Sequence, residues 1–135
     1  MLRFVLVALV TLCSVVAAHA GPSGTENRPL KVAASGKPLR LGDVYDVDPD
    51  CSAVAGITIR LLIAPAHGQF TSRPGMVFPQ FPASNPDSVC NGRRVLGSQQ
   101  TYISRPGYTG PDSIDFEIIF PNGEARHIHV PIRVM

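Results

Sequence analysis

Several kinds of segment are missing from this sequence of 135 residues, and each absence excludes a class of protein. After residue 20, no apolar run approaches the roughly 20 residues that a membrane-spanning helix needs, so we expect no membrane span. Basic residues form no run beyond Arg93-Arg94, so nucleic-acid binding is not expected. The G-x-S-x-G, H-E-x-x-H and phosphate-loop motifs are also missing. These absences predict a protein that is not an enzyme and has no cofactor.

The first 20 residues have the pattern of a secretory signal peptide. Arg3 precedes an apolar run from Phe4 to Ala18, and the small residues around His19 end at Ala20. This pattern is typical of a peptide that is removed on export. We therefore expect a periplasmic or secreted protein whose mature chain begins near Gly21.

A cysteine within this region leaves a second possibility open. Cys13 could be the first mature residue of a lipid-anchored protein, which would tie the chain to a membrane surface. Leu12 stands where that kind of signal usually has a small residue. The cleaved, unanchored form is therefore preferred.

The chain that remains has the size of a single domain. Removing 20 of 135 residues leaves 115, and removing Arg3 reduces the 12 basic residues to eleven against ten acidic ones. A chain of this length can bury about two thirds of its unfolded surface without a metal. Residues 21–29 are small and polar, which predicts a flexible leader. The folded domain is expected over residues 30–135.

Two cysteines lie outside the signal region, and we expect them to form a disulfide. Cys51 and Cys90 are 39 residues apart. In an oxidising compartment an even pair is usually bridged, and a loop of that size contributes about 4 kcal/mol through chain entropy. Metal binding or redox chemistry is the alternative, but the pair lacks the Cys-x-x-Cys spacing typical of such sites.

Hydrophobic periodicity predicts strands and no helices. From Ile57 to Ile63, isoleucine and leucine at every second position indicate one row of side chains on a core, and residues 69–71 are expected to return as the second arm of a hairpin. Three later runs are also strand-like: residues 98–104, 114–120 and 128–134. A Pro-Asn-Gly turn joins the last two, and Pro131 predicts an edge strand or a bulge. Short strands separated by turns favour an all-β, antiparallel β-sandwich of about seven strands.

Residues 104–120, SRPGYTGPDSIDFEIIF, contain the most patterned segment. Gly107 and Gly110 allow conformations that are costly for other residues, Tyr108 combines an apolar ring with a hydroxyl, and Asp112 can accept backbone N–H groups. Together with Tyr102, these residues predict a structural corner between two sheets. Each has a possible folding role, so the segment need not bind a ligand.

The same segment resembles a known family. Residues 102–116, YISRPGYTGPDSIDF, are similar to the Y-x-P-x-x-G-Y-x-G-x-D-x-F-x-Y signature of bacterial immunoglobulin-like, or cadherin-like, domains of exported proteins. Residues 65–70, PAHGQF, resemble the P-x-H-G-x-V hairpin of that family, although Ile114 and Phe116 depart from its usual phenylalanine and tyrosine. The resemblance implies an immunoglobulin-like fold and a role in adhesion, spacing or binding, without shared catalytic residues.

Alternation in the last hairpin places potential metal ligands together. If the isoleucines of the two strands share a face, Asp115 and Glu117 lie on the opposite face, beside His127 and His129. Zinc and copper accept imidazole and carboxylate ligands, so this face is a candidate metal site. Outward-facing strand positions are polar in any case, so ordinary surface pairing explains the same pattern.

A second group of carboxylates could bind calcium. Asp43, Asp46, Asp48 and Asp50 lie within eight residues, and calcium favours clustered carboxylates. An EF-hand loop beginning at Asp46 is excluded because Cys51 stands where glycine is needed. A solvated acidic loop is the alternative.

The long segment from residue 73 to residue 97 offers a partner-binding surface. Phe78, Phe81, Arg93 and Arg94 could form a mixed aromatic and cationic surface for a protein or glycan. Alternatively, the two phenylalanines cap the sandwich. The sequence thus predicts an exported, non-catalytic immunoglobulin-like module that binds a protein or glycan at the cell envelope, with a small periplasmic metal-binding protein as the alternative.

Overall fold

The computed structural model describes residues 24–135, so the predicted signal peptide lies outside the described residues. In chain order the elements are β1 (Thr25–Asn27), β2 (Lys31–Ala33), β3 (Pro38–Val44), β4 (Thr58–Ile63), β5 (Gly68–Val77), the 3-10 helix η1 (Pro86–Cys90), β6 (Val95–Ser104), β7 (Gly110–Ile119) and β8 (Ala125–Val134). Within this range no helix has the length and apolar character needed to cross a bilayer.

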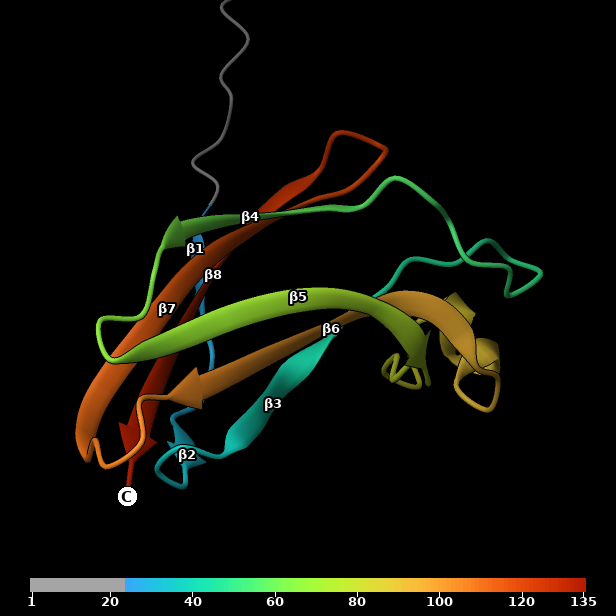
Figure 1. The fold of residues 1–135 in the computed structure, drawn as a ribbon. Helices are drawn as coiled ribbons and strands as arrows, with labels where there is room; N and C mark the ends of the chain where they lie inside the picture. The colour runs from blue at the N-terminus through green and yellow to red at the C-terminus, as the bar shows by residue number, and fades with distance from the viewer. Residues whose placement is uncertain (1–23) are drawn as a thin grey trace, which may run out of the picture.

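The strands form two facing sheets (Figure 1). One sheet has the order β1-β8-β7-β4, with β2 also paired to β8, and the other has the order β3-β6-β5. This division of strands is that of an immunoglobulin-like sandwich, so the predicted fold class is confirmed. Residues 24–135 contain eight strands, and the two short N-terminal strands pair with β8 in parallel rather than antiparallel.

The segment expected to be a flexible leader is partly ordered, and that expectation is wrong for β1. Thr25 pairs with His127, and the backbone N–H of Arg28 donates to the carbonyl of His129 at 2.8 Å. The segment buries little apolar surface, as its composition indicates. The free backbone edge of β8 provides its hydrogen bonds instead.

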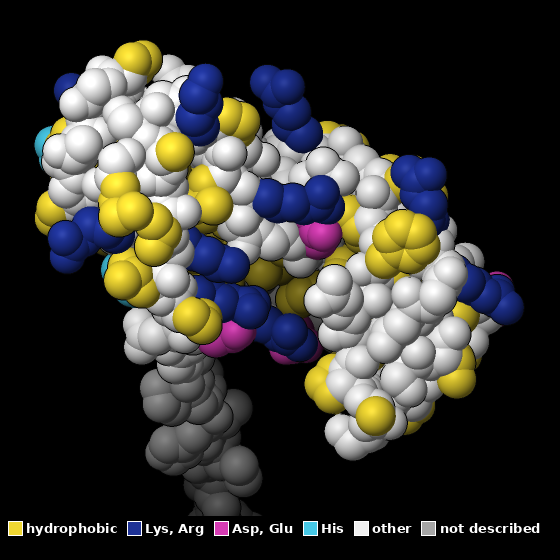
Figure 2. Space-filling model, turned by 90° about the horizontal axis from the view of Figure 1, so that it is seen from below, with side chains coloured by type: hydrophobic (Ala, Val, Ile, Leu, Met, Phe, Trp, Pro, Cys, Tyr) yellow, Lys and Arg dark blue, Asp and Glu magenta, His cyan; other side chains and the backbone are white. Residues whose placement is uncertain are grey.

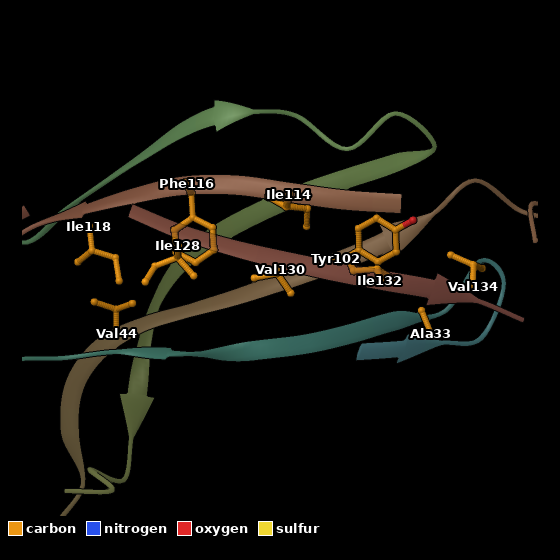
Figure 3. Close-up of a cluster of buried hydrophobic side chains, with 10 residues drawn as sticks. All are labelled: Ala33, Val44, Tyr102, Ile114, Phe116, Ile118, Ile128, Val130, Ile132 and Val134. Atoms are coloured by element: carbon orange, nitrogen blue, oxygen red, sulfur yellow. The ribbon is translucent and has the colours of Figure 1, made fainter. Parts of the chain in front are cut away.

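The core lies between the sheets and follows the predicted alternation of β7 and β8. Figure 3 shows ten buried side chains pointing toward one another, mainly from these two strands and from β3 and β6: Ala33, Val44, Tyr102, Ile114, Phe116, Ile118, Ile128, Val130, Ile132 and Val134. Across the sheets the rings of Phe70 and Phe116 stack with centroids 5.2 Å apart. The Pro-Asn-Gly turn closes with a hydrogen bond from the Gly123 N–H to the Phe120 carbonyl, and Gly123 has φ +88°.

The predicted hairpin of residues 57–71 is wrong. β4 pairs with β7, whereas β5 pairs with β6, so the chain between them crosses from one sheet to the other. The row of core side chains also ends early: Ile57 and Ile59 pack against the core, but Leu61 and Ile63 are 42% and 59% exposed. A shift of register between Leu61 and Ile63 interrupts the alternation at this sheet edge.

Pro131 lies in β8 between the residues that pair with β1 and those that pair with β2. The carbonyl of His129 accepts from Arg28, and the N–H of Met135 donates to Ala33, so both groups face the N-terminal segment. Backbone groups of every second residue in a strand face the same side, so the nitrogen of Pro131 also faces that segment. At that position the parallel partner changes. The missing N–H therefore breaks no ladder bond, although β8 is not an edge strand.

The predicted disulfide is present. Cys51 and Cys90 are bonded, with their Cα atoms 5.4 Å apart. Cys90 is fully buried in a second apolar cluster with Val47, Val77 and Val95, which covers the far end of the β5–β6 hairpin. The bridge thus attaches the loop after β3 to η1 and anchors the long segment before β6.

Candidate functional site

The corner predicted from residues 102–112 centres on the carboxylate of Asp112. It accepts hydrogen bonds from the backbone N–H groups of Ala66 and His67, at 2.9 and 3.0 Å, and from the hydroxyl of Tyr102, at 2.8 Å. One side chain therefore connects β6, β7 and the chain that crosses between β4 and β5. Sequence reasoning anticipated the backbone contacts of Asp112 but missed its bond to Tyr102.

Tyr102 is fully buried, and Gly68 makes room for it. A Cβ atom on Gly68 would lie 2.4 Å from the Tyr102 ring and 2.5 Å from the carbonyl of Ile103, which only glycine avoids. Burial, together with the hydrogen bond to Asp112, raises the pKa of Tyr102 above its ordinary value. The tyrosine is thus held as a neutral hydrogen-bond donor.

Tyr108 completes the corner from outside. Its ring stacks on His67 with centroids 4.0 Å apart and planes 9° apart, and its hydroxyl donates to the carbonyl of Pro111 at 2.6 Å. Gly107 and Gly110 have φ values of +82° and +133°, which disfavour other residues. These contacts account for each of the five residues assigned to the corner.

The polar face of the last hairpin brings three titratable side chains together, which we call the His-Asp-His array: His127, Asp115 and His129. Asp115 is 8% exposed, and its two carboxylate oxygens lie 3.1 Å from Nε2 of His127 and 3.1 Å from Nδ1 of His129. The hydroxyl of Thr25 is 3.1 Å from Nδ1 of His127. A neutral His127 ring that donates to Asp115 can therefore accept from Thr25.

The fourth predicted ligand does not join this array. Glu117 pairs with His127 in the strand register, but its carboxylate forms an ion pair with Arg60 of β4. Within residues 24–135 no group of three or more His, Cys, Asp or Glu side chains is arranged to hold a metal ion. All three contacts given above, the two with Asp115 and the one with Thr25, are hydrogen bonds within the protein, and metal binding at this face stays a prediction.

The four aspartates predicted to bind calcium do not converge. Asp43 lies on β3 and forms an ion pair with the arginine three residues before it. Asp46 accepts the N–H of the following residue, Asp48 is 3.4 Å from the hydroxyl of Ser52, and Asp50 accepts both the N–H and the hydroxyl of Ser52. The Ser52 hydroxyl, followed by its N–H, lowers the pKa of Asp50. These bonds organise the loop locally, which fits the alternative of a solvated acidic loop.

The predicted partner-binding residues divide into two groups. Phe78 is 53% exposed, and Arg93 and Arg94 are exposed near the disulfide. Phe81 instead packs edge-on against Tyr45, with ring centroids 5.4 Å apart, and belongs to the second apolar cluster. We therefore remove Phe81 from the set and call Phe78, Arg93 and Arg94 the partner surface.

An apolar cleft that the sequence did not predict opens at the same end of the sandwich. It has a volume of about 450 Å³ and lies between residues 53–57, the start of β4 and the adjoining parts of β5 and β6. Val44, at the end of β3, also contributes to its lining. The cleft therefore borders the end of the main core.

A smaller hollow of about 140 Å³ opens beside β3, where Arg28 and Asp43 stand next to core side chains such as Phe116 and Ile128. Figure 2 shows hydrophobic atoms at the floor of a hollow with basic and acidic side chains around it. Arg28 forms an ion pair with Glu26, at 3.2 Å. The hollow thus has charged groups at its mouth, whereas the larger cleft has none in its lining.

No family model matches the chain, and no curated protein matches it. Among solved structures, the chain is similar to the solution structure of Amebosin, with a TM-score of 0.38 and 14% sequence identity over 85% of this chain and 100% of that chain. A similarity of this size supports no inference about function.

Proposed function

We propose that the protein is an exported, non-catalytic, immunoglobulin-like module that binds a protein or glycan partner at the cell envelope. The disulfide supports an oxidising compartment, since such bonds persist outside the cytosol. The resemblance of residues 102–116 to exported immunoglobulin-like domains supports the same location. Contacts within the fold account for all the corner residues, so a role in folding is sufficient to explain the most patterned part of the sequence.

Exposed apolar side chains at the disulfide-tied end carry the proposal. Between residues 76 and 96, four large hydrophobic side chains are 44–74% exposed: Met76, Phe78, Val89 and Leu96. Exposed hydrophobic side chains that form a contiguous patch mark interaction sites on proteins. Aromatic residues and arginine are enriched at binding surfaces, and Phe78, Arg93 and Arg94 are all exposed in this segment.

Photo-cross-linking in producing cells would test this role. A photoreactive amino acid at position 78 is expected to yield a discrete adduct, whereas the same amino acid at position 122, which is an exposed polar position in the turn between β7 and β8, is expected to yield none. Phe78→Ser combined with Arg94→Ser should weaken recovery of the same partner at least tenfold without changing the urea midpoint. No adduct at position 78, or identical adducts at both positions, would contradict a partner surface here.

A further inference from the structure

The apolar cleft exists because the two sheets differ in extent. On the inner face of the β5–β6 hairpin, the register places Phe70 opposite Tyr102 in the core and, farther along, Met76 opposite Leu96. Residues directly opposite each other share a face, and residues an even number of positions apart along a strand also share a face. Met76 and Leu96 therefore lie on the same face of the hairpin as Phe70 and Tyr102. They are nonetheless 44% and 57% exposed, because the other sheet does not extend over them.

The opposite wall consists of residues 53–57, which are held in place by several bonds. Ala53 forms a bridge with Val47, and the N–H of Val54 donates to the carbonyl of Asp46 at 3.0 Å. The disulfide at Cys51 fixes the chain just before this wall. These bonds hold residues 53–57 in place, so they also maintain the gap between this wall and the β5–β6 hairpin.

The chemistry of the lining defines what fits. The walls are aliphatic, with Val54, Ile57 and Ile59 on one side and Leu96 on the other, and none of the lining residues is charged or aromatic. The side-chain hydrogen-bonding groups are the hydroxyls of Ser72 and Ser98, which lie 2.7 Å apart.

The serine pair is supported from within the protein. Gln100 is 1% exposed, and its amide donates to Ser72 Oγ at 3.3 Å. Each hydroxyl has one donor and two acceptor positions, so the pair retains acceptor capacity toward the cleft. A buried polar group beneath an apolar cleft fixes the orientation of a bound molecule.

These features select one class of ligand. An ion would need a charged partner, and a sugar ring or base would gain most from an aromatic side chain, but the lining has neither. An aliphatic chain can fill the walls, and an uncharged polar group can bond to the serine hydroxyls. The volume of about 450 Å³ falls in the range of small-molecule sites.

We propose that this cleft binds the aliphatic chain of a neutral amphiphile, with the polar group of the amphiphile on Ser72 and Ser98. None of the partner-surface residues lines the cleft. Leu96 lines the cleft and is also one of the exposed apolar side chains named under the proposed function, but the partner test uses Phe78 and Arg94, which do not line the cleft. The two proposals are therefore tested with different residues, and either can fail without the other.

Displacement of a neutral fluorescent probe, N-phenyl-1-naphthylamine, would test the site on the full mature chain with its disulfide intact. Probe fluorescence is expected to rise with saturation, and 1-decanol is expected to displace the probe. Across 1-hexanol, 1-octanol and 1-decanol, affinity should rise about fourfold for each added CH₂. Ionised decanoate should displace the probe at least tenfold less well than decanol.

Two variants change residues on opposite walls of the cleft, and a third variant is the control. Leu96→Gln removes an aliphatic contact and Ala55→Phe fills the space, and each should weaken probe binding at least about tenfold. Val89→Gln changes a residue that is 74% exposed and does not line the cleft, so binding should be unchanged. Both test residues are exposed, so the urea midpoints should stay close to that of the wild type.

Absence of saturable fluorescence, or equal loss of binding in all three variants, would overturn the proposal. Displacement by decanoate as efficient as by decanol would overturn the assignment of an uncharged polar group. If one test variant fails to fold, the other decides, because the two lie on different walls.

Discussion

Replacement of Asp112 by alanine tests the view that one carboxylate holds the corner together. The substitution removes the acceptor for the N–H groups of Ala66 and His67 and for the hydroxyl of Tyr102. The donors come from two separate parts of the chain, residues 66–67 and β6, and the carboxylate joins both to β7. We expect a large loss of stability without a change of fold.

The exposure of each donor sets the magnitude. Tyr102 is fully buried, so its unpaired hydroxyl costs about 1–3 kcal/mol. His67 is half-buried, which adds about 1 kcal/mol, whereas the exposed N–H of Ala66 can bond to water at little cost. The free energy of unfolding should therefore fall by about 3 kcal/mol. At a urea m-value of about 1.5 kcal/mol/M, the midpoint falls by about 2 M.

Urea unfolding followed by far-UV circular dichroism, with the disulfide oxidised, would measure this change. Asp87→Ala is a matched control in η1 and should cost less than about 0.5 kcal/mol. Tyr102→Phe combined with Asp112→Ala should cost about 1 kcal/mol less than the two single changes together, since they share one hydrogen bond. A loss below about 1 kcal/mol for Asp112→Ala, or strict additivity, would refute the reasoning.

Four further predictions concern other parts of the fold. The pKa of Tyr102 is raised in the folded state, so the stability contributed by its neutral hydroxyl is present below the unfolded pKa of about 10 and is lost as pH rises through the folded pKa. Tyr102→Phe should therefore reduce the fall of the urea midpoint at alkaline pH. An unchanged pH profile in this variant would contradict the argument. Cys51→Ser with Cys90→Ser should lower the free energy of unfolding by about 4 kcal/mol in the same assay, and a loss under 1 kcal/mol would show that the loop is otherwise restrained. Gly68→Ala should cost about 3 kcal/mol through its clash with Tyr102, whereas Gly42→Ala, whose Cβ meets no atom within 4 Å, should cost less than about 1 kcal/mol; equal losses would contradict the steric argument. Calorimetric titration with zinc or copper tests the His-Asp-His array: saturable heat that disappears when both histidines become alanine supports a metal site, whereas absence of heat ends the hypothesis.

Local alternation predicted the last hairpin because both strands are long and have one buried face. Ile114 and Ile128 lie in the core, and Asp115 lies on the opposite face next to His129, as the period of two requires. The turn between these strands depends on residues adjacent in the sequence. The hairpin and its turn can be predicted from sequence because each depends on residues that are close together along the chain.

Features that depend on distant segments were not predictable in the same way. Thr25 is ordered by pairing with His127, 102 residues away, and nothing in its own neighbourhood indicates a strand. The row from Ile57 to Ile63 alternates in sequence, but the register shift between Leu61 and Ile63 belongs to the pairing of β4 with the distant strand β7. The cleft also depends on distant segments, since Leu96 looks like a core residue in sequence and is exposed in the fold.

Parallel pairing of the N-terminal strands with β8 has a mechanical consequence. β1 pairs with the beginning of β8 and β2 with its end, where Met135 donates to the carbonyl of Ala33 (Figure 1). Tension between residue 24 and residue 135 would pull these neighbouring strands in opposite directions along their length. The hydrogen bonds of β1 and β2 to β8 would then be loaded together in shear, instead of opening one after another. An element with little buried surface would thus become the part of the fold that resists extension.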